Sequence, residues 1–237
     1  MATLGIDTFI NGLNRKLEPP VQKHLKNVYS TMCMALLSAS AGGYLHLYSN
    51  IISGGLLSSL GLLGFALVLW STPDTVKNRN TRLGYLLGFS VCSGLSMGPL
   101  LDMAIILNPT LILQALVSTC IIFGCFTVST FFADHRKYLY LGGTLMSCLS
   151  IMMLASLLNI FLRSQILFDL YLYGGLFVFC GFICYDTALI IEKRRMGEED
   201  YISHAMMLFI DFVDVFRHLL IILSKREADS DRKKKRN

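Results

Sequence analysis

The chain alternates long apolar runs with short polar connections, and seven such runs follow one another between residues 27 and 224. Six runs are nearly free of charge, whereas the seventh carries charges in its middle. Each run is close to the roughly 20 residues that a helix needs to cross the hydrocarbon of a bilayer. We therefore predict membrane-length helices at 27–48, 51–71, 83–107, 109–132, 138–161, 167–190 and 204–224.

The seventh run, His204 to Ser224, reads HAMMLFIDFVDVFRHLLIILS. On a helix, Asp211, Asp214 and His218 fall at i, i+3 and i+7 and share one face, and Arg217 can pair with Asp214. Charges at bilayer depth are costly and almost always face protein or a water-filled path. The pattern thus predicts an all-α integral membrane protein, a seven-helix bundle whose last helix is central and surrounded by the other six.

Composition agrees with a membrane protein and excludes an ordinary soluble domain. The chain is 54% hydrophobic and 16% charged, with a mean hydropathy of +0.56, whereas soluble domains are about 25% charged. We predict an N-terminal segment at 1–26, one membrane domain at 27–224 and a basic tail at 225–237. All seven cysteines lie inside apolar runs, where we expect buried, reduced thiols.

Basic residues are distributed unequally between alternate connections. Twelve Lys and Arg residues lie on the side of the N-terminus and one lies on the other side. The twelve are Arg15, Lys16, Lys23, Lys26, Lys77, Arg79, Arg82, Arg136, Lys137, Lys193, Arg194 and Arg195. Because basic loops stay in the cytosol, we predict a cytosolic N-terminus.

The basic tail leaves two questions open. If the seventh run spans the membrane, the seven basic residues of the tail lie outside the cytosol, against the charge rule. If the run instead enters the membrane and returns to the same side, these residues stay in the cytosol. The ending with Lys234 and Lys235 also resembles a dilysine signal for retrieval to the endoplasmic reticulum. The alternative is a solvated basic tail near anionic lipid headgroups.

Three local signals concern helix geometry. Pro99 lies inside the third run and should kink it. Asn108 and Pro109 are a cap and first residue for the fourth helix. Small residues four apart, such as Gly94 and Gly98, predict close helix packing.

Two aspartates in consecutive runs fall at similar depth. Asp186 precedes Lys193 by seven residues, and Asp211 follows His204 by seven. At 1.5 Å per residue, both are roughly 10 Å from the loop that joins the two helices. A direct contact between their carboxyl groups is therefore expected near the cytosolic end, whether or not the seventh run finally spans.

Such a pair has two alternative interpretations. Two touching carboxylates cannot both stay charged, so they share a proton and the pair can sense pH. Arg82 or Arg217 is the candidate cation that latches the ionised pair. Asp214 and His218 are candidate auxiliary groups. Ionised, Asp186 and Asp211 offer hard oxygen ligands for transient Ca²⁺ binding. The alternative is that they are only hydrogen-bonding contacts between helices. No bound cofactor is expected. Asp102, near the opposite end of the third run, should play no part.

Several motifs together resemble the Bax inhibitor-1 family, the transmembrane Bax-inhibitor-motif proteins. They are VQKHLKNVY, Met97-Gly98-Pro99, Tyr138 to Gly143, Tyr185-Asp186-Thr187 to Lys193, Asp200-Tyr201 and LFIDFVDVFRHLLIIL. The resemblance extends from about Pro20 to the basic tail and is specific only when the motifs are taken together.

The resemblance implies a seven-helix bundle with a central last helix, in the endoplasmic reticulum membrane. It implies suppression of cell death and a pH-sensitive calcium leak that uses the paired aspartates, here Asp186 and Asp211. It also implies Bcl-2-family or other reticulum membrane proteins as partners. Asp214 and Ala188 depart from the family pattern, so no pH midpoint is carried over.

Two further function classes can be weighed against a leak channel. An interaction protein that regulates death-pathway or reticulum-stress partners would need no ion path, and flux through the purified protein in liposomes separates the two. An enzyme is disfavoured, because no nucleophile–base pair, HExxH or phosphate loop is present. The glycine-containing motif of intramembrane aspartyl proteases is missing around Asp186 and Asp211. The short basic tail does not indicate nucleic-acid binding.

Overall fold

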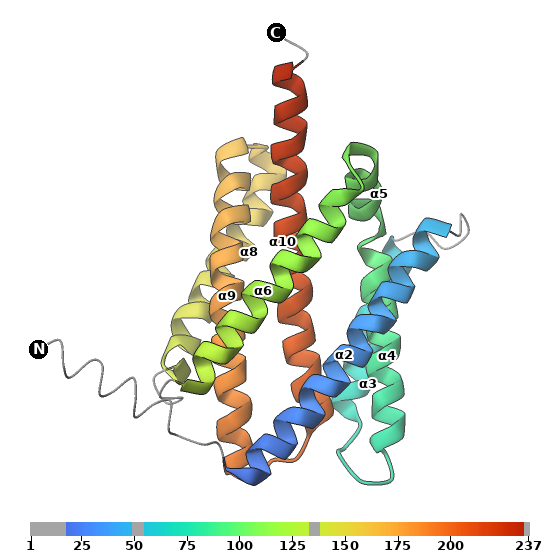
Figure 1. Cartoon of the computed structure of the whole chain (residues 1–237), viewed down its shortest axis with the longest axis vertical. Helices are drawn as coiled ribbons and strands as arrows, with labels where there is room; N and C mark the ends of the chain where they lie inside the picture. Colours follow the sequence, from blue (N-terminus) through green and yellow to red (C-terminus); the bar gives the residue numbers. More distant parts are fainter. Residues whose placement is uncertain (1–17, 49–54, 133–137, 235–237) are drawn as a thin grey trace, which may run out of the picture. The chain divides into compact units, whose positions relative to one another are not determined.

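The computed structural model describes residues 18–48, 55–132 and 138–234 of the 237-residue chain (Figure 1). Those residues form eight α-helices and no strand. The helices are α2 (Pro19–Tyr48), α3 (Leu56–Ser71), α4 (Arg79–Ser96), α5 (Gly98–Leu107), α6 (Thr110–Phe132), α8 (Leu141–Leu162), α9 (Gln165–Arg195) and α10 (Tyr201–Lys234).

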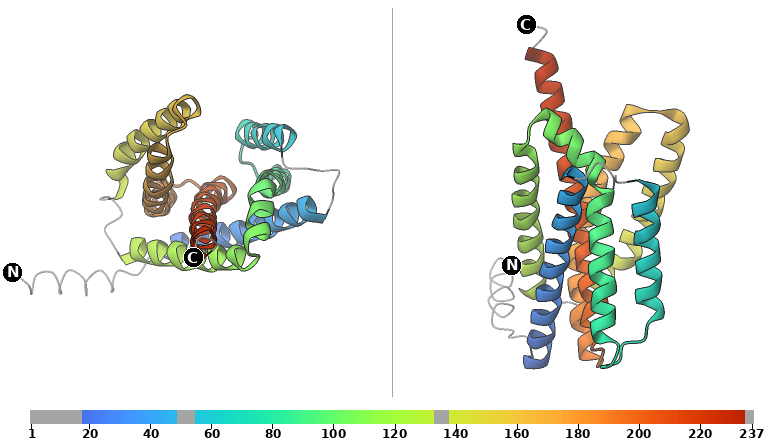
Figure 2. Two further views of the ribbon diagram at one scale, coloured as in Figure 1. Left: turned by 90° about the horizontal axis from the view of Figure 1, so that it is seen from above. Right: turned by 90° about the vertical axis from the view of Figure 1, so that its right-hand side faces the viewer.

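The helices divide between two compact units. The first unit contains α8, α9, most of α6 and the middle of α10, within Leu116–Glu199 and Asp211–Ile222, with the start of α2. The second contains α3, α4, α5, the rest of α2 and both ends of α10. In the first unit, α8 and α9 lie side by side as a hairpin, and in the second α3 and α4 do the same (Figures 1 and 2).

The predicted kink in the third run is confirmed. The run is two helices, α4 and α5, which meet at Met97 and are bent by 42°. Pro99 lies in the first turn of α5, where its missing N–H costs nothing. It cannot donate the hydrogen bond that would continue α4.

Asn108 caps the fourth run as predicted, but the helix begins one residue later than the predicted Pro109. The Asn108 side-chain oxygen accepts hydrogen bonds from the backbone N–H of Thr110 at 3.1 Å and from its hydroxyl at 2.8 Å. Helix α6 begins at Thr110, directly after Pro109.

Two helix boundaries differ most from those predicted. Helix α2 begins at Pro19, eight residues before the expected start, because prolines in a first helical turn lack only an N–H that the helix leaves unpaired anyway. Helix α10 continues ten residues beyond Ser224 to Lys234, through polar positions that the apolar pattern does not mark.

The apolar side chains of several helices point away from the protein. On α8, Ile151 is 66% exposed and Phe161 is 86% exposed. Within the described residues, α6, α8 and α9 are long and apolar enough to cross a membrane, α4 with α5 makes a fourth such span if the bent pair counts as one, and α3 is a shorter apolar helix. These helices make the chain a multi-pass membrane protein, with outward apolar surface that suits lipid.

The expectation of buried cysteines is wrong for four of the seven. Cys180 and Cys184 are buried and Cys92 is half-buried. The exposed ones are Cys33, Cys120, Cys125 and Cys148. The physical reason is that an apolar run of a membrane protein is apolar on its lipid-facing side too, so apolar surroundings in the sequence do not indicate burial.

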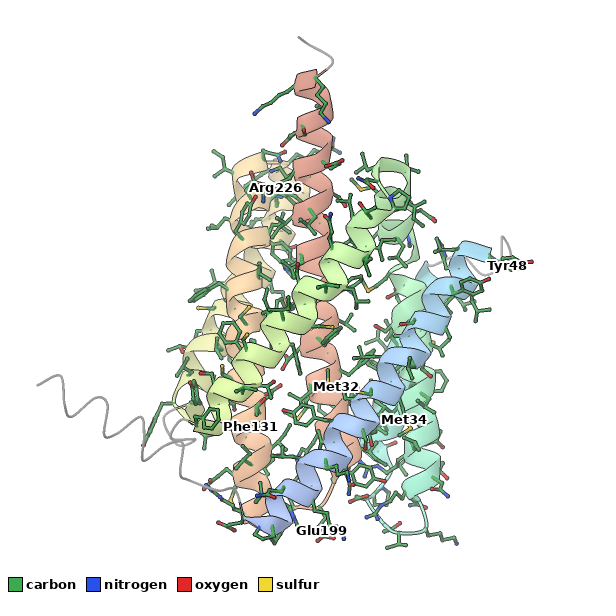
Figure 3. The ribbon with its side chains drawn as sticks, in the orientation of Figure 1. Met32, Met34, Tyr48, Phe131, Glu199 and Arg226 are labelled. Carbon is green, nitrogen blue, oxygen red and sulfur yellow. The ribbon has the colours of Figure 1, made fainter. Side chains whose placement is uncertain are left out.

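Helices differ in how far around their circumference they are buried. On α2, Met32 is 3% exposed and Met34 is 43% exposed, so only one side is covered (both are labelled in Figure 3). On α10, the consecutive residues Asp211, Phe212 and Val213 are all buried. Consecutive residues point about 100° apart on a helix, so α10 is covered over more than half its circumference there.

The close approach of α2 and α4 generates a stability prediction. A methyl group on Gly94 would collide with the backbone oxygen of Ala39, whereas one on Gly84, also on α4, would meet nothing within 4 Å. We expect Gly94→Ala to lower the free energy of unfolding by about 1–3 kcal/mol or more, because neither backbone can move away easily. Thermal unfolding in detergent measures this.

Gly84→Ala is the matched control, and it should be neutral or slightly stabilising because alanine favours a helix. Equal melting temperatures for the two variants would contradict the close packing of α2 on α4.

Candidate functional site

Asp186 on α9 and Asp211 on α10 are the most deeply buried aspartates among the residues the structure describes, with 8% and 5% exposure. Their carboxyl groups lie close enough to interact directly. Carboxylates only accept hydrogen bonds, so a hydrogen bond between two carboxyl groups requires one of them to carry a proton. A proton shared by the pair stays a prediction.

More hydrogen-bonding capacity surrounds the pair than the described residues use. The Oδ2 atom of Asp211 is buried without a hydrogen-bond partner among them. The hydroxyl of Thr187, the next residue after Asp186 on α9, is also buried without a hydrogen-bond partner among the described residues. Buried polar groups of this kind commonly bind water or an ion.

The charged residues one and two turns farther along α10 pair with one another. Arg217 Nη1 lies 3.4 Å from Asp214 Oδ1, and both side chains are partly exposed. The His218 ring donates from Nδ1 to the backbone oxygen of Asp214 at 2.8 Å. Asp214 is thus half-buried and faces Arg217, and its influence on the Asp186–Asp211 pair stays a prediction.

Arg82 is buried in a cluster of its own. Its Nη2 donates to Asp200 Oδ2 at 2.6 Å and to Ser203 Oγ at 2.9 Å, and its Nη1 lies 2.8 Å from Asp74 Oδ1. With its side chain 3% exposed, Arg82 joins α4 to the α3–α4 loop and to the start of α10. A latch from Arg82 to Asp186 or Asp211 stays a prediction.

Asp200 caps α10 while it binds Arg82. Its Oδ1 accepts the backbone N–H of Ser203 at 3.1 Å, the usual geometry of an aspartate N-cap. Burial alone raises the pKa of Asp200, but hydrogen bonds from Arg82 and Ser203 and the charge of Arg82 outweigh it. The pKa of Asp200 is consequently lowered, and the side chain is an anion at neutral pH.

Sequence reasoning missed this cluster, although one signal was available. An aspartate directly before a long apolar run, such as Asp200, is a typical helix cap. The partners Asp74 and Arg82 lie more than 100 residues away, in and beside a loop, so sequence spacing gives no indication of them.

Asp102 has a partner that sequence reasoning also missed. Its Oδ2 lies 3.0 Å from His46 Nε2, at the last turn of α2. The pair is a second contact with a titratable group, in the second unit.

Of the two tail lysines, Lys234 is the last residue of α10, and Lys235 lies outside the described residues.

The Asp200 cluster generates a prediction for stability and its pH dependence. Asp200→Asn keeps the helix cap but loses the charge that binds Arg82. We therefore expect the free energy of unfolding to fall by about 1.5–3 kcal/mol, which is typical of a hydrogen bond to a charged group. Because the folded pKa is lowered, this contribution is present above roughly pH 4 and disappears as pH falls through the folded value. Melting temperatures between pH 7 and pH 3 measure it.

Glu199→Gln is the control, because Glu199 is an exposed neighbour whose pair with Arg194 should contribute little. If the melting temperatures of wild type and Asp200→Asn differ by the same amount at pH 3 and pH 7, the ion pair between Asp200 and Arg82 does not contribute as proposed.

Comparison with known proteins gives consistent matches over nearly the whole chain. The family described as "Inhibitor of apoptosis-promoting Bax1" matches residues 21–228. The chain is 46% identical over 218 residues to Bax inhibitor 1 of Bos taurus and 45% identical over 219 residues to that of Homo sapiens, with 92% of each chain covered. It is 43% identical over 218 residues to Bax inhibitor 1 of Arabidopsis thaliana, covering 92% of this chain and 87% of the relative.

Proposed function

The chain belongs to the Bax inhibitor-1 family, and from this premise we propose that it suppresses cell death in the endoplasmic reticulum membrane. Its relatives in animals and plants carry the name Bax inhibitor 1. Similarity over 92% of both chains supports a shared activity, because the matched residues 21–228 contain nearly all of the membrane helices and their connections. The family description names an inhibitor rather than an enzyme, and we assign no catalytic activity.

The proposed mechanism is a calcium leak that responds to pH through Asp186 and Asp211. The observation that carries it is the close approach of these two buried carboxyl groups on consecutive helices. A hydrogen bond between carboxyl groups needs a proton, so the geometry of the contact depends on protonation. Ionised carboxylates are also oxygen ligands of the kind that Ca²⁺ prefers, so the permeant ion can bind where the proton leaves.

The sign of the pH response follows from the cation that we propose as a latch. When the pair is ionised, Arg82 or Arg217 is attracted to it and holds the path closed. A proton from the cytosol removes negative charge, weakens this attraction and lets the helices part. An energy of about 1.4 kcal/mol is enough to change a two-state opening equilibrium tenfold.

We propose that α10 is the central helix of a seven-helix bundle, with α4 and α5 counted as one span. Burial of three consecutive residues, Asp211 to Val213, supports a helix covered on several sides. The charges in the middle of α10 support the same position, because lipid would disfavour them.

An interaction protein is the second candidate, and the family description favours it. That description names a protein, Bax1, as what is inhibited. In this alternative the chain binds Bcl-2-family or other reticulum membrane proteins, and the aspartate pair only holds α9 to α10. Calcium flux through the purified protein alone separates the alternatives.

The leak is tested with purified protein in liposomes across a pH series. We expect Ca²⁺ flux to rise about tenfold between the closed and open states as the pH on the cytosolic face falls. Asp186→Asn and Asp211→Asn resemble a protonated carboxyl group in shape but cannot titrate, so either change should flatten the pH dependence.

Asp229→Asn on the exposed end of α10 is the matched control and should keep the wild-type profile. Asp102→Asn removes the charge that faces His46 and should also keep the wild-type pH profile. Folded Asp186→Asn and Asp211→Asn proteins with the full wild-type response would place the sensor elsewhere and favour the interaction protein.

The proposed topology is tested by a glycosylation tag. With twelve basic residues on one side and one on the other, a tag at Thr3 should remain unglycosylated in microsomes, because it stays on the cytosolic face. Glycosylation of the tag would show a luminal N-terminus and overturn the topology.

A further inference from the structure

A cavity of about 340 Å³ lies between α8 and α9, within the size range of small-molecule sites. Leu157 and Ser156 line it on α8, and Tyr171 and Phe179 line it on α9. Apart from Ser156 and the Tyr171 hydroxyl, the lining side chains are apolar. The cavity therefore suits an apolar ligand with a small polar end.

The mouth of the cavity is at the membrane side of the hairpin. Met153 and Leu157, both in the lining, are 66% and 49% exposed. Both helices are among those long and apolar enough to cross a bilayer. A ligand can thus enter sideways from the lipid.

His218 lies behind this lining. Its ring is 5.6 Å from the Tyr171 ring and 5.1 Å from the Phe179 ring, between centroids, and the residue is 2% exposed. A methyl group on Gly175 would lie 2.5 Å from His218 Nε2 and 2.8 Å from the end of Met152, which also lines the cavity. The absence of a side chain at Gly175 lets the imidazole reach this wall.

The hydrogen bond at one ring nitrogen determines what the other can do. The Asp214 carbonyl only accepts, so Nδ1 carries the hydrogen. In the neutral ring, Nε2 is then an acceptor, and it is buried without a partner among the described residues. A buried acceptor of this kind favours a ligand that brings an O–H or N–H donor.

Depth along the helices places His218 and Gly175 in the half of the span away from the α9–α10 loop. Gly175 precedes Lys193 by 18 residues, and His218 follows Asp200 by 18. Both are therefore roughly 27 Å along their helices from that loop. The leaflet opposite the α9–α10 loop is thus the one whose lipids lie nearer to the cavity.

We propose that this cavity binds diacylglycerol from the leaflet opposite the α9–α10 loop. The free hydroxyl of the lipid donates to His218 Nε2, and one acyl chain lies along Leu157 and Phe179. The flexible side chain of Met152 moves aside to admit the hydroxyl. Phosphatidylcholine lacks a donor, so it cannot satisfy the imidazole. The site shares His218 with the auxiliary groups of the aspartate pair, but lipid binding does not depend on the proposed calcium leak.

The experiment uses the full chain in phosphatidylcholine nanodiscs with a diacylglycerol or a phosphatidylcholine that carries a photoactivatable group in one acyl chain. Cross-linked peptides are identified by mass spectrometry. We expect labelling of α8 and α9 by the diacylglycerol probe, with competition by unlabelled diacylglycerol. Equal labelling by both probes, or no competition, would overturn the proposal and leave a groove for bulk lipid.

Matched variants on α8 locate the ligand. Leu157→Trp fills the mouth and should abolish the specific labelling. Leu154→Trp, one turn earlier, alters a side chain that is 61% exposed and outside the lining, so labelling should persist. Labelling that survives Leu157→Trp would contradict the site.

A third pair of variants tests the hydrogen bond. His218→Phe keeps a ring but loses the acceptor, so the preference for diacylglycerol over phosphatidylcholine should fall roughly fivefold, as for one hydrogen bond. His218→Gln restores an acceptor and should recover part of it. An unchanged preference in folded His218→Phe would show that the imidazole does not bind the hydroxyl. If neither variant folds, the competition and tryptophan results decide the proposal.

Discussion

The cost of placing a charge in hydrocarbon is the constraint on which the other features of α10 depend. This helix carries Asp211, Asp214, Arg217 and His218 within eight residues. Each finds a specific partner: Asp211 contacts Asp186, Asp214 pairs with Arg217, and His218 bonds a backbone carbonyl. The shared proton that we propose for the two aspartates would reduce the charge that has to be buried.

In the second unit, at the start of α10, a buried charge is likewise paired. Arg82 is buried, and two carboxylates and a hydroxyl surround it. Because Asp200 both caps α10 and binds Arg82, one carboxylate starts that helix and fixes its beginning to α4 by charge. Closely packed glycines, such as Gly94 beside Ala39, allow α2 to approach α4 in the same unit. Polar contacts and small residues therefore supply specificity that apolar surface alone does not give in lipid.

Local features of this structure could be predicted from the sequence, and contacts between distant loops could not. Pro99 and Asn108 marked a bend and a helix start, because their backbone requirements are local. Counting residues from the loop that joins α9 and α10 predicted that Asp186 and Asp211 lie at the same depth. The partners of Arg82 lie in segments that no periodicity relates, and the cavity beside His218 depends on how Tyr171 and Phe179 pack.

Difference infrared spectroscopy of the protonated carboxyl band tests most directly whether Asp186 and Asp211 share one proton. The wild-type protein in nanodiscs should show one buried carboxylic-acid band that shifts or disappears in Asp186→Asn and also in Asp211→Asn, because each variant removes one of the two groups that hold the proton. The same band should persist unchanged in Asp229→Asn. A band whose frequency is unchanged in either single substitution, or that is absent from the wild type, would contradict a shared proton.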